Sequence, residues 1–521
     1  MATQSRTSAR LDDPLVAELT RMLQAGSGEF FHETSPLTGE LYARIPLSNR
    51  DDVERAFRTA RGFQPRWAAV PVAERSACLL RLHDLLLDHC EPLLDLICAE
   101  SGKARMDAYM ELVHLALTAR YYGRRGPALM RTRRRPGGVP LLTRLDINRI
   151  PAGVVGLITP WNYPLTMALA DGITALVAGN TIVHKPASQT MLTALAGLAV
   201  LRAAGVPSAA WQMVAGPGST VGSQVAEQAD MICFTGSTET GRVLAGQAAG
   251  QLKSISAELG GKNPALVLAD ADIEAAAQGL ARAAFNNAGQ LCTHIERIHV
   301  DARVLGSFRA AFIEAVGELN LAPGLDWDCD VGTLISADQL NKVQAHLADA
   351  RSKGAVVLYG GRARPDLAPW CHEPTVLEGV TPDADCYLGE TFGPLVSLYS
   401  FSTPEEAIEQ ANQGVQGLNA SIWTSDHRRA RQLARRLRAG TVNINEGYAA
   451  ALASLWGPMG GMGESGIGRR QGSEGLLRFT ETQTVATQRL LPIAPLPGID
   501  RGRFARAVTA GLRIMRYTRR P

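Results

Sequence analysis

The sequence predicts an α/β fold in which parallel strands alternate with helices. From residue 153 onward, short apolar runs typical of buried strands are separated by helix-like segments. The clearest runs are 154–158, 181–184, 231–234 and 265–268. Parallel strands need long crossover connections, which helices provide, so this alternation favours parallel sheets covered by helices. The length of 521 residues further predicts two or three domains.

The part of the chain before residue 153 is predicted to be mainly helical. Leucines recur at helical spacing between Val53 and Tyr122. Residues 133–138 are three arginines followed by a proline and two glycines. We interpret them as a solvated turn rather than a nucleic-acid site, because no aromatic residues accompany the arginines. Residues 141–150 then alternate like a strand.

The second half of the chain continues the alternation and ends in a basic segment. Strands are expected at 297–300, 356–359, 396–401 and 481–490. Residues 501–521 contain seven arginines and no acidic residue, and their apolar residues recur at helical spacing. Two interpretations of this tail stay open. In the first, it is a basic amphipathic helix that touches a membrane surface or an acidic partner. In the second, it is a helix that packs on a neighbouring subunit, or a disordered basic end.

The composition argues against a membrane-spanning or secreted protein and favours a reducing compartment. The hydrophobic fraction is 46%, but no run of about 18 apolar residues exists, and the first residues lack the apolar core of a signal peptide. The eight cysteines form no CxxC pair and no disulfide pattern. We therefore expect a protein of the reducing cytoplasm, where a reactive thiol survives. No metal site is predicted.

The main candidates for catalysis are a cysteine and a carboxylate. Cys292 ends the segment NAGQLC, and Glu258 begins the segment ELGGKNP. A thiolate attacks an electrophilic carbonyl, and a separate carboxylate can activate the water that releases the covalent intermediate. A lone cysteine is most often a small buried apolar residue, so the argument depends on the other motifs.

A nucleotide site is indicated where the strand at 231–234 ends. Gly236 and Ser237 stand in FTGSTETG, between a strand and a helix, where free N–H groups and the helix dipole favour a pyrophosphate. A serine cap on the helix is the ordinary alternative. Lys185 ends its own strand, and in an open α/β sheet such a position faces the ligand crevice.

Six motifs in order resemble those of the aldehyde dehydrogenase superfamily, across nearly the whole chain. They are TPWNYP (159–164), HKPAS (184–188), FTGSTE (234–239), ELGGKNP (258–264), GQLC (289–292) and ETFGP (390–394). Within this superfamily the chain is most similar to the NADP-dependent succinate-semialdehyde dehydrogenase branch. The resemblance implies an enzyme that oxidises an aldehyde to a carboxylic acid with NAD(P), and a Rossmann-type cofactor domain beside an α/β catalytic domain and a small oligomerisation sheet.

The resemblance also implies a role for each matching residue. Cys292 would form a thiohemiacetal and then a thioester, and Asn162 with the Cys292 N–H would hold the oxyanion. Glu258 would activate the hydrolytic water, which favours a free acid as the product. Glu390 would hold the nicotinamide ribose, with Phe392 beside the ring. The implied cofactor-binding residues are Trp161, Asn162, Lys185, Pro186, Ala187, Ser188, Gly236, Ser237, Leu259, Glu390 and Phe392.

Three further positions bear on the cofactor and the substrate. Ser188 stands where NAD-preferring relatives commonly carry a glutamate, so NADP is expected, with NAD as the alternative. Ala170 and Asn286 stand where known succinate-semialdehyde enzymes carry arginines, and Arg282 nearby should face elsewhere. Succinate semialdehyde and a less charged, more apolar aldehyde, long-chain or aromatic, therefore both stay open. His294 is expected to be a wall residue of the pocket, with lowering of the thiol pKa as the alternative.

The expected architecture follows the resemblance. The cofactor domain should comprise residues 1–132 and 151–260, and the catalytic domain residues 261–460. Residues 133–150 and 476–490 should supply oligomerisation strands of a homodimer or homotetramer, followed by the basic tail 491–521. No nucleic-acid partner is expected. A non-enzymatic scaffold remains an alternative, and so does an aldehyde oxidase that associates with membranes through the tail.

Overall fold

The structure is a computed structural model that describes residues 14–137, 142–490, 492 and 494–517. The chain divides into two compact units. The first unit comprises Met1–Leu129 and Pro151–Thr480, and the second comprises Met130–Ile150 and Glu481–Pro521.

The first sheet of the first unit is mostly parallel. Its strand order is β19-β9-β8-β5-β6-β7. The strands are β5 (Val154–Ile158), β6 (Thr181–Lys185), β7 (Trp211–Met213), β8 (Met231–Thr235), β9 (Ser254–Glu258) and the antiparallel β19 (Gly466–Ile467). They are connected by α6 (Pro164–Ala178), α7 (Met191–Ala203), α8 (Ser223–Gln228) and α9 (Thr238–Gly250). The chain runs from β5 to β6 and β7 and then returns to the other side of β5, so a ligand crevice is expected at the carboxyl ends of β5 and β8.

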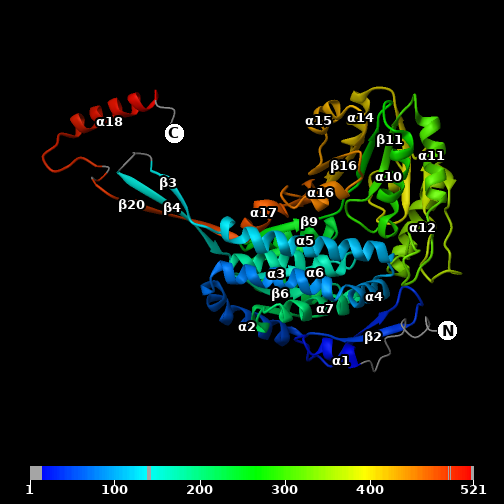
Figure 1. Cartoon of the computed structure of the whole chain (residues 1–521), viewed down its shortest axis with the longest axis horizontal. Helices are drawn as coiled ribbons and strands as arrows, with labels where there is room; N and C mark the ends of the chain where they lie inside the picture. Colours follow the sequence, from blue (N-terminus) through cyan, green and yellow to red (C-terminus); the bar gives the residue numbers. More distant parts are fainter. Residues whose placement is uncertain (1–13, 138–141, 491, 493, 518–521) are drawn as a thin grey trace. The chain divides into compact units, whose positions relative to one another are not determined.

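The second sheet of this unit has the strand order β12-β13-β14-β11-β10-β16-β17. Its strands are β10 (Asn263–Val267), β11 (Ile295–Asp301), β12 (Val356–Tyr359), β13 (Thr375–Glu378), β14 (Leu395–Phe401), β16 (Asn419–Trp423) and β17 (Thr441–Ile444), and only β12 is antiparallel to its neighbour. The helices of this part are α10 (Ile273–Phe285), α11 (Leu305–Gly317), α12 (Ala337–Ser352), α13 (Asp385–Leu388), α14 (Pro404–Ala411) and α15 (His427–Ala434). Helices α10 and α11 pack on each other and on β11 (Figure 1).

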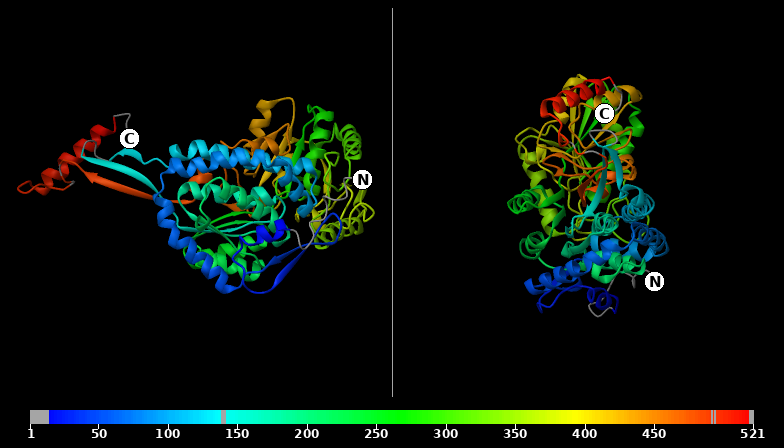
Figure 2. Two further views of the ribbon diagram at one scale, coloured as in Figure 1. Left: turned by 60° about the horizontal axis from the view of Figure 1, so that its bottom comes forward. Right: turned by 90° about the vertical axis from the view of Figure 1, so that its left-hand side faces the viewer.

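The helical N-terminal part consists of separate helices rather than one continuous segment. They are α1 (Pro14–Thr20), α2 (Arg50–Ala69), α3 (Val72–Asp88), α4 (Cys90–Ser101) and α5 (Arg105–Leu129), with the hairpin β1 (Phe30–Thr34) and β2 (Leu41–Pro46) between the first two. Pro71 precedes α3, and Gly102 ends α4 in a left-handed conformation, which explains two of the breaks. Helix α5 packs along α3 and α6 (Figures 1 and 2).

Short elements complete the first unit. They are the pair β15 (Gln416–Gly417) and β18 (Met462–Gly463), α16 (Ala449–Ala453) and α17 (Gly472–Leu477). None of the helices among the described residues is both long and apolar enough to span a bilayer.

Within its described residues, the second unit contains a sheet of three strands and one helix. The strand order is β20-β4-β3, with β3 (Arg133–Pro136), β4 (Thr143–Pro151) and β20 (Thr480–Gln488), and the helix is α18 (Arg501–Met515). The turn that we expected over 133–138 is therefore wrong for 133–136. Arg133 to Pro136 pair antiparallel with β4, and Arg134 lies 3.8 Å from the carboxylate of Asp146, so a partner strand overrides the local turn composition. Residue 138 of that turn and residue 141 of the expected strand lie outside the described residues.

A packing prediction follows from Gly172 in α6. Gly172 is buried, and a Cβ at this position would overlap the ring of Trp211, which is itself fully buried. We expect Gly172→Ala to lower the free energy of unfolding by about 1–3 kcal/mol, because overpacking forces a rigid indole to move. Chemical denaturation followed by tryptophan fluorescence measures this change.

Gly246→Ala is the matched control. Gly246 is exposed in α9, and nothing lies within 4 Å of a Cβ built there. The same substitution should therefore raise the free energy of unfolding by about 0.5–1 kcal/mol through the helix preference of alanine. Equal unfolding midpoints for the two variants would show that Trp211 does not constrain Gly172.

Candidate active site

A cavity of about 480 Å³ lies where the carboxyl ends of β5, β8 and β9 meet the second sheet. It brings together Cys292, Glu258 and Asn162. Of the predicted cofactor-binding residues, Trp161, Asn162, Gly236, Ser237, Leu259, Glu390 and Phe392 also line it. Lys185 to Ser188 do not line this cavity. Lys185 ends β6 and Pro186 to Ser188 follow it, and β6 pairs with β5, whose carboxyl end does border the cavity. Residues distant in sequence therefore share one site.

The segment between β9 and β10 carries Glu258 from one sheet to the other. Glu258 is the last residue of β9, and Asn263 is the first residue of β10. Gly260 and Gly261 lie between them without room for a side chain, since a Cβ on Gly260 would overlap the carboxylate of Glu390. Asn263 donates its side-chain amide to the carbonyl oxygens of Cys292 at 2.8 Å and of His294 at 2.7 Å. One short connection thus bears a candidate base and holds the backbone of the candidate nucleophile.

The loop that presents Cys292 has a left-handed backbone. Asn287, Ala288 and Gly289 have φ angles of 49°, 52° and 73°. Such angles are costly for residues other than glycine, so other contacts must hold the loop. The carboxylate of Asp107 accepts the Asn287 N–H at 2.7 Å. At Gly289 only glycine fits, because a Cβ would overlap the carbonyl oxygen of Gly393.

Asn162 is fixed from both of its ends. Its side-chain amide donates to the carbonyl oxygen of Gln290 at 2.9 Å, two residues before Cys292. Its own carbonyl oxygen accepts hydrogen bonds from the Lys103 ammonium at 2.7 Å and from the Asn287 side-chain amide at 3.0 Å. The amide of Asn162 therefore lies beside the Cys292 loop, where an oxyanion donor is required.

A buried ion pair supports Asn162 and the start of α6. The Lys103 ammonium donates to the carboxylate of Glu111 at 2.7 Å, and both side chains are fully buried. The other oxygen of Glu111 accepts the N–H groups of Leu165 and Thr166, at 2.6 Å and 3.0 Å. These N–H groups lie in the first turn of α6, where no partner within the helix exists, so Glu111 acts as a cap from α5.

Burial favours the neutral forms of Glu258 and Cys292 by raising the pKa values of both groups. Burial raises the pKa of Glu258 to about 7 and the pKa of the Cys292 thiol to about 12, and Arg470 opposes both shifts. One carboxyl oxygen of Glu258 is buried without a hydrogen-bond partner among the described residues. A carboxyl group with a pKa near neutrality can take up and release protons at physiological pH.

A charged cluster that the sequence analysis missed also lines the cavity. Asp171 in α6 forms ion pairs with Arg470 and Arg478, and the Arg470 Nη2–Asp171 Oδ2 distance is 2.7 Å. The pKa of Asp171 is low, because the two guanidinium groups outweigh the effect of burial. Nothing in the local sequence indicates these pairs, since about three hundred residues separate Asp171 from both arginines.

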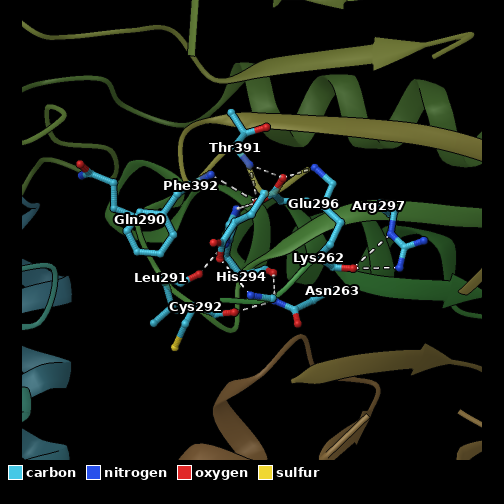
Figure 3. A network of polar contacts seen from close by, with 12 residues as sticks. Lys262, Asn263, Gln290, Leu291, Cys292, His294, Glu296, Arg297, Thr391 and Phe392 are labelled. Atoms are coloured by element: carbon cyan, nitrogen blue, oxygen red, sulfur yellow. Dashed lines mark hydrogen bonds and ion pairs between the residues drawn. The ribbon is translucent and has the colours of Figure 1, made fainter. Parts of the chain in front are cut away.

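A second buried network positions the loop of Glu390 and Phe392 (Figure 3). The carboxylate of Glu296 pairs with Lys262 and accepts the N–H groups of Thr391, at 3.1 Å, and of Phe392, at 3.4 Å. Burial raises the pKa of Glu390, whose carboxylate accepts the Gly261 N–H at 3.0 Å. The rings of Phe392 and Trp161 lie edge to face at 5.7 Å. The network therefore places an acid and two aromatic rings at one end of the cavity.

His294 does not line the cavity, and the expectation of a pocket-wall residue is wrong. The side chain is fully buried, with Nδ1 beside the Leu291 carbonyl oxygen and Nε2 3.2 Å from a carboxylate oxygen of Glu296 (Figure 3). Residues 292–294 form a turn before β11, in which the His294 N–H donates to the Leu291 carbonyl oxygen at 3.0 Å, and this turn directs the side chain into the Glu296 network.

The crevice beside Lys185 suits a phosphate-bearing ligand. Burial lowers the pKa of the Lys185 ammonium to about 8, and no hydrogen bond or ion pair satisfies this group within the described part of the chain. Ser237 caps the N-terminus of α9, which follows β8, and β5 lies between β8 and the strand β6 of Lys185. A buried cation without an anionic partner and the positive end of the α9 dipole both favour an anion.

Two of the three positions that we expected to bear on substrate choice lie at the cavity. Ala170 and Asn286 both line the cavity, and Asn286 accepts the Tyr163 hydroxyl at 2.5 Å. Arg282 is exposed on α10 and does not line the cavity, as predicted. The remaining wall near Ala170 is largely apolar, with Met110, Val113, Leu117, Met167, Leu452 and Met459.

Comparison with known proteins agrees with this geometry. The model of the aldehyde dehydrogenase family matches residues 23–485. A putative NADP(+) succinate-semialdehyde dehydrogenase of Mycolicibacterium smegmatis is 47% identical over 476 residues, which cover 91% of this chain and 92% of that protein. A probable enzyme of the same name from Sinorhizobium fredii is 37% identical, over 87% of this chain and 91% of that protein.

Solved structures show the same fold. An NADP-dependent enzyme of E. coli has a TM-score of 0.87 at 33% identity, covering 92% of this chain and all of the other (100%). An NAD-dependent aldehyde dehydrogenase of Sinorhizobium meliloti has a TM-score of 0.86 at 31% identity, covering 93% and 98%. The predicted fold class is thereby confirmed. The chain belongs to the aldehyde dehydrogenase family and is an NAD(P)-dependent oxidoreductase that acts on aldehydes.

Proposed function

We propose that the protein oxidises succinate semialdehyde to succinate with NADP⁺, through a covalent intermediate on Cys292. The observation that carries this proposal is the meeting of Cys292, Glu258 and Asn162 in one cavity. The substrate and the cofactor are supported by the names of the relatives at 47% and 37% identity.

In the proposed mechanism the Cys292 thiolate attacks the aldehyde carbon and forms a thiohemiacetal. The Asn162 amide and the Cys292 N–H stabilise the oxyanion, since both donors are fixed before the reaction. The residues assigned to the cofactor below would hold NADP⁺, which would supply a hydride acceptor. Loss of the hydride from the former aldehyde carbon leaves a thioester on Cys292. Glu258 then removes a proton from water, the water attacks the thioester, and the acid product leaves as the thiolate reforms.

The proposed cofactor site follows the carboxyl edge of the first sheet. Lys185 supplies an unpaired buried cation, and Ser188 offers a hydroxyl where a carboxylate would repel a 2′-phosphate. Glu390 would hold the nicotinamide ribose. The other residues assigned to the cofactor are Trp161, Asn162, Pro186, Ala187, Gly236, Ser237, Leu259 and Phe392.

An uncharged, apolar aldehyde is the second candidate substrate. The apolar wall near Ala170 favours it, as does the lack of an arginine at 170 and 286. A panel of aldehydes with and without a distal carboxylate, assayed with NAD⁺ and NADP⁺, decides between the two substrate classes.

We also propose a homodimer or homotetramer in the cytoplasm. Strand β20 is almost wholly exposed and lies at the edge of its sheet, and such edges pair readily with another chain. All eight cysteines are free, and all lie within the described residues, which suits a reducing compartment. The proposed limits of the cofactor and catalytic domains remain those predicted from the sequence.

The first functional prediction concerns the two steps of the reaction. Cys292→Ala should abolish aldehyde-dependent NADPH formation. Glu258→Gln should release about one NADPH per site in a rapid burst and then turn over at least about 100-fold more slowly, because general-base assistance is lost. Stopped-flow absorbance at 340 nm measures both phases, and steady turnover of Glu258→Gln at the wild-type rate would contradict the role of Glu258.

The pKa of Glu258 predicts the pH dependence of hydrolysis. Glu258 accepts a proton only in its ionised form, and burial places its pKa at about 7. The rate of the hydrolytic step in the wild type should therefore rise with pH through about 7 and fall about tenfold per pH unit below it. In Glu258→Gln this rise should disappear. A profile that keeps the same midpoint in the variant would assign the titration to another group.

The cofactor prediction concerns Ser188. Ser188→Glu should lower kcat/KM for NADP⁺ at least about tenfold, with little loss for NAD⁺, because the new carboxylate repels the 2′-phosphate. Ser188→Gln is the uncharged control of similar size and should retain most of the NADP⁺ activity. A wild-type preference for NAD⁺, or equal effects of the two substitutions, would contradict the assignment.

A further inference from the structure

The Asp171 cluster, consisting of Asp171, Arg470 and Arg478, has more positive than negative charge. The two oxygens of Asp171 pair with one guanidinium each. The three side chains are nearly buried, with exposed fractions of 7%, 13% and 9% for Asp171, Arg470 and Arg478. Two cations that share one carboxylate away from water attract a further anion.

Two of the guanidinium nitrogens of Arg470 lack a strong hydrogen-bond acceptor within the described residues. Its Nη2 donates to Asp171 and to the hydroxyl of Thr235. Its Nη1 has the Met167 thioether as its contact, at 3.3 Å, and its Nε has no hydrogen-bond partner within the described residues. A thioether is a weak acceptor, so a carboxylate oxygen would be a much better partner for Nη1.

The position of Arg470 connects it with the aldehyde end of the cavity. Met167 and Ala170 are three residues apart on α6, so they share one face of the helix, and both line the cavity. Asp171 follows Ala170 and anchors the guanidinium of Arg470 beside this face. Arg470 also opposes the rise in the pKa of Cys292, which places it within electrostatic range of the thiol. The methyl group of Ala170 leaves this space open.

We propose that Arg470 binds the distal carboxylate of the substrate, in the place of the arginines absent at 170 and 286. The inference rests on the proposed function, because it concerns the same cavity and the same class of aldehyde. It explains how a site with an apolar wall accepts a semialdehyde that carries a carboxylate. Arg470 would thus determine substrate specificity.

The test compares succinate semialdehyde with butanal, an uncharged aldehyde that also has four carbons. Arg470→Gln removes the same electrostatic support of Cys292 and Glu258 for both aldehydes, so the readout is the ratio of the two. The substitution should raise KM for succinate semialdehyde at least about tenfold, and it should lower kcat/KM for succinate semialdehyde at least about tenfold more than kcat/KM for butanal. Arg470→Lys should recover part of the loss. Arg469→Gln is the matched control, because it removes the same charge from a neighbouring residue that does not line the cavity.

The outcomes separate this inference from the proposed function. A wild-type protein inactive with both aldehydes would refute the proposed function. A wild type that oxidises succinate semialdehyde but shows no selective loss in Arg470→Gln would overturn only the role of Arg470. Equal losses with both aldehydes would also overturn it, since they would indicate an effect on Glu258 or on folding.

Helix α18 supports a second and independent inference. Its apolar residues Phe504, Val508 and Leu512 recur every four positions and form one stripe, and Val508 and Leu512 are 42% and 58% exposed. Arg503, Arg506 and Arg513 lie outside this stripe on the helix, and Arg516 follows at its C-terminal cap. No acidic residue occurs from 501 to 521, and the segment follows the residues that match the family model.

We propose that α18 binds the surface of an anionic bilayer. The apolar stripe would enter the interface between headgroups and acyl chains, and the arginines would pair with lipid phosphates. The charge of the helix fits this partner, because an acid-free basic helix complements a negative surface. One short helix gives reversible attachment, and the active-site unit needs no change for it.

Flotation with vesicles tests this proposal on the full chain. Vesicles of phosphatidylglycerol and phosphatidylcholine should carry the protein, and vesicles of phosphatidylcholine alone should not. Arg506→Gln with Arg513→Gln, and separately Val508→Ser with Leu512→Ser, should each lower the bound fraction at least about fivefold while butanal oxidation stays unchanged. Unbound wild type overturns the proposal, and so does a change of sedimentation coefficient in these variants without vesicle binding, which would assign α18 to contact with a second copy.

Discussion

The buried ion pair of Lys103 and Glu111 is the interaction on which the geometry of the site depends. It fixes the carbonyl oxygen of Asn162 on one side and the first turn of α6 on the other. Removing one partner would leave a buried charge alone, which typically costs about 3–5 kcal/mol. The helical layer at the N-terminus is therefore part of the active site, although none of the motifs lies in it. Asp107 in the same helix, α5, holds the left-handed loop before Cys292.

The low polarity of the cavity determines its resting state. Burial raises the pKa values of both Cys292 and Glu258, so near pH 7 the thiol is mainly protonated and the carboxyl group is about half protonated until the charges of the bound reactants change the balance. The same exclusion of water protects a thioester from premature attack. Arg470 opposes the rise in both pKa values, because its positive charge stabilises a negative charge on Cys292 or on Glu258. Burial and the positive charge of Arg470 thus act in opposite directions on the ionisation of Cys292 and Glu258.

The sequence predicts local chemistry well and long-range support poorly. The six motifs placed Cys292, Glu258 and Asn162 correctly in one cavity, since each motif is a strand end or a loop with a fixed local form. Arg133 to Arg135 form a strand only because β4 lies beside them, and His294 turns inward only because Glu296 receives it. The contacts of Lys103 with Asn162 and of Arg470 with Asp171 join residues 59 and 299 positions apart, and no local pattern reveals them.

The connection between β9 and β10 has a mechanical consequence. Four residues separate the end of one sheet from the start of the other. A Cβ on Gly260 would contact the Glu390 carboxylate, and a Cβ on Gly261 would contact the Cys292 carbonyl oxygen. A hinge needs free volume around the bond that rotates, and little is left beside these two glycines. The connection therefore limits movement between the two sheets at the point where Glu258 and the Cys292 loop meet, and Asn263 at its far end holds the Cys292 carbonyl oxygen.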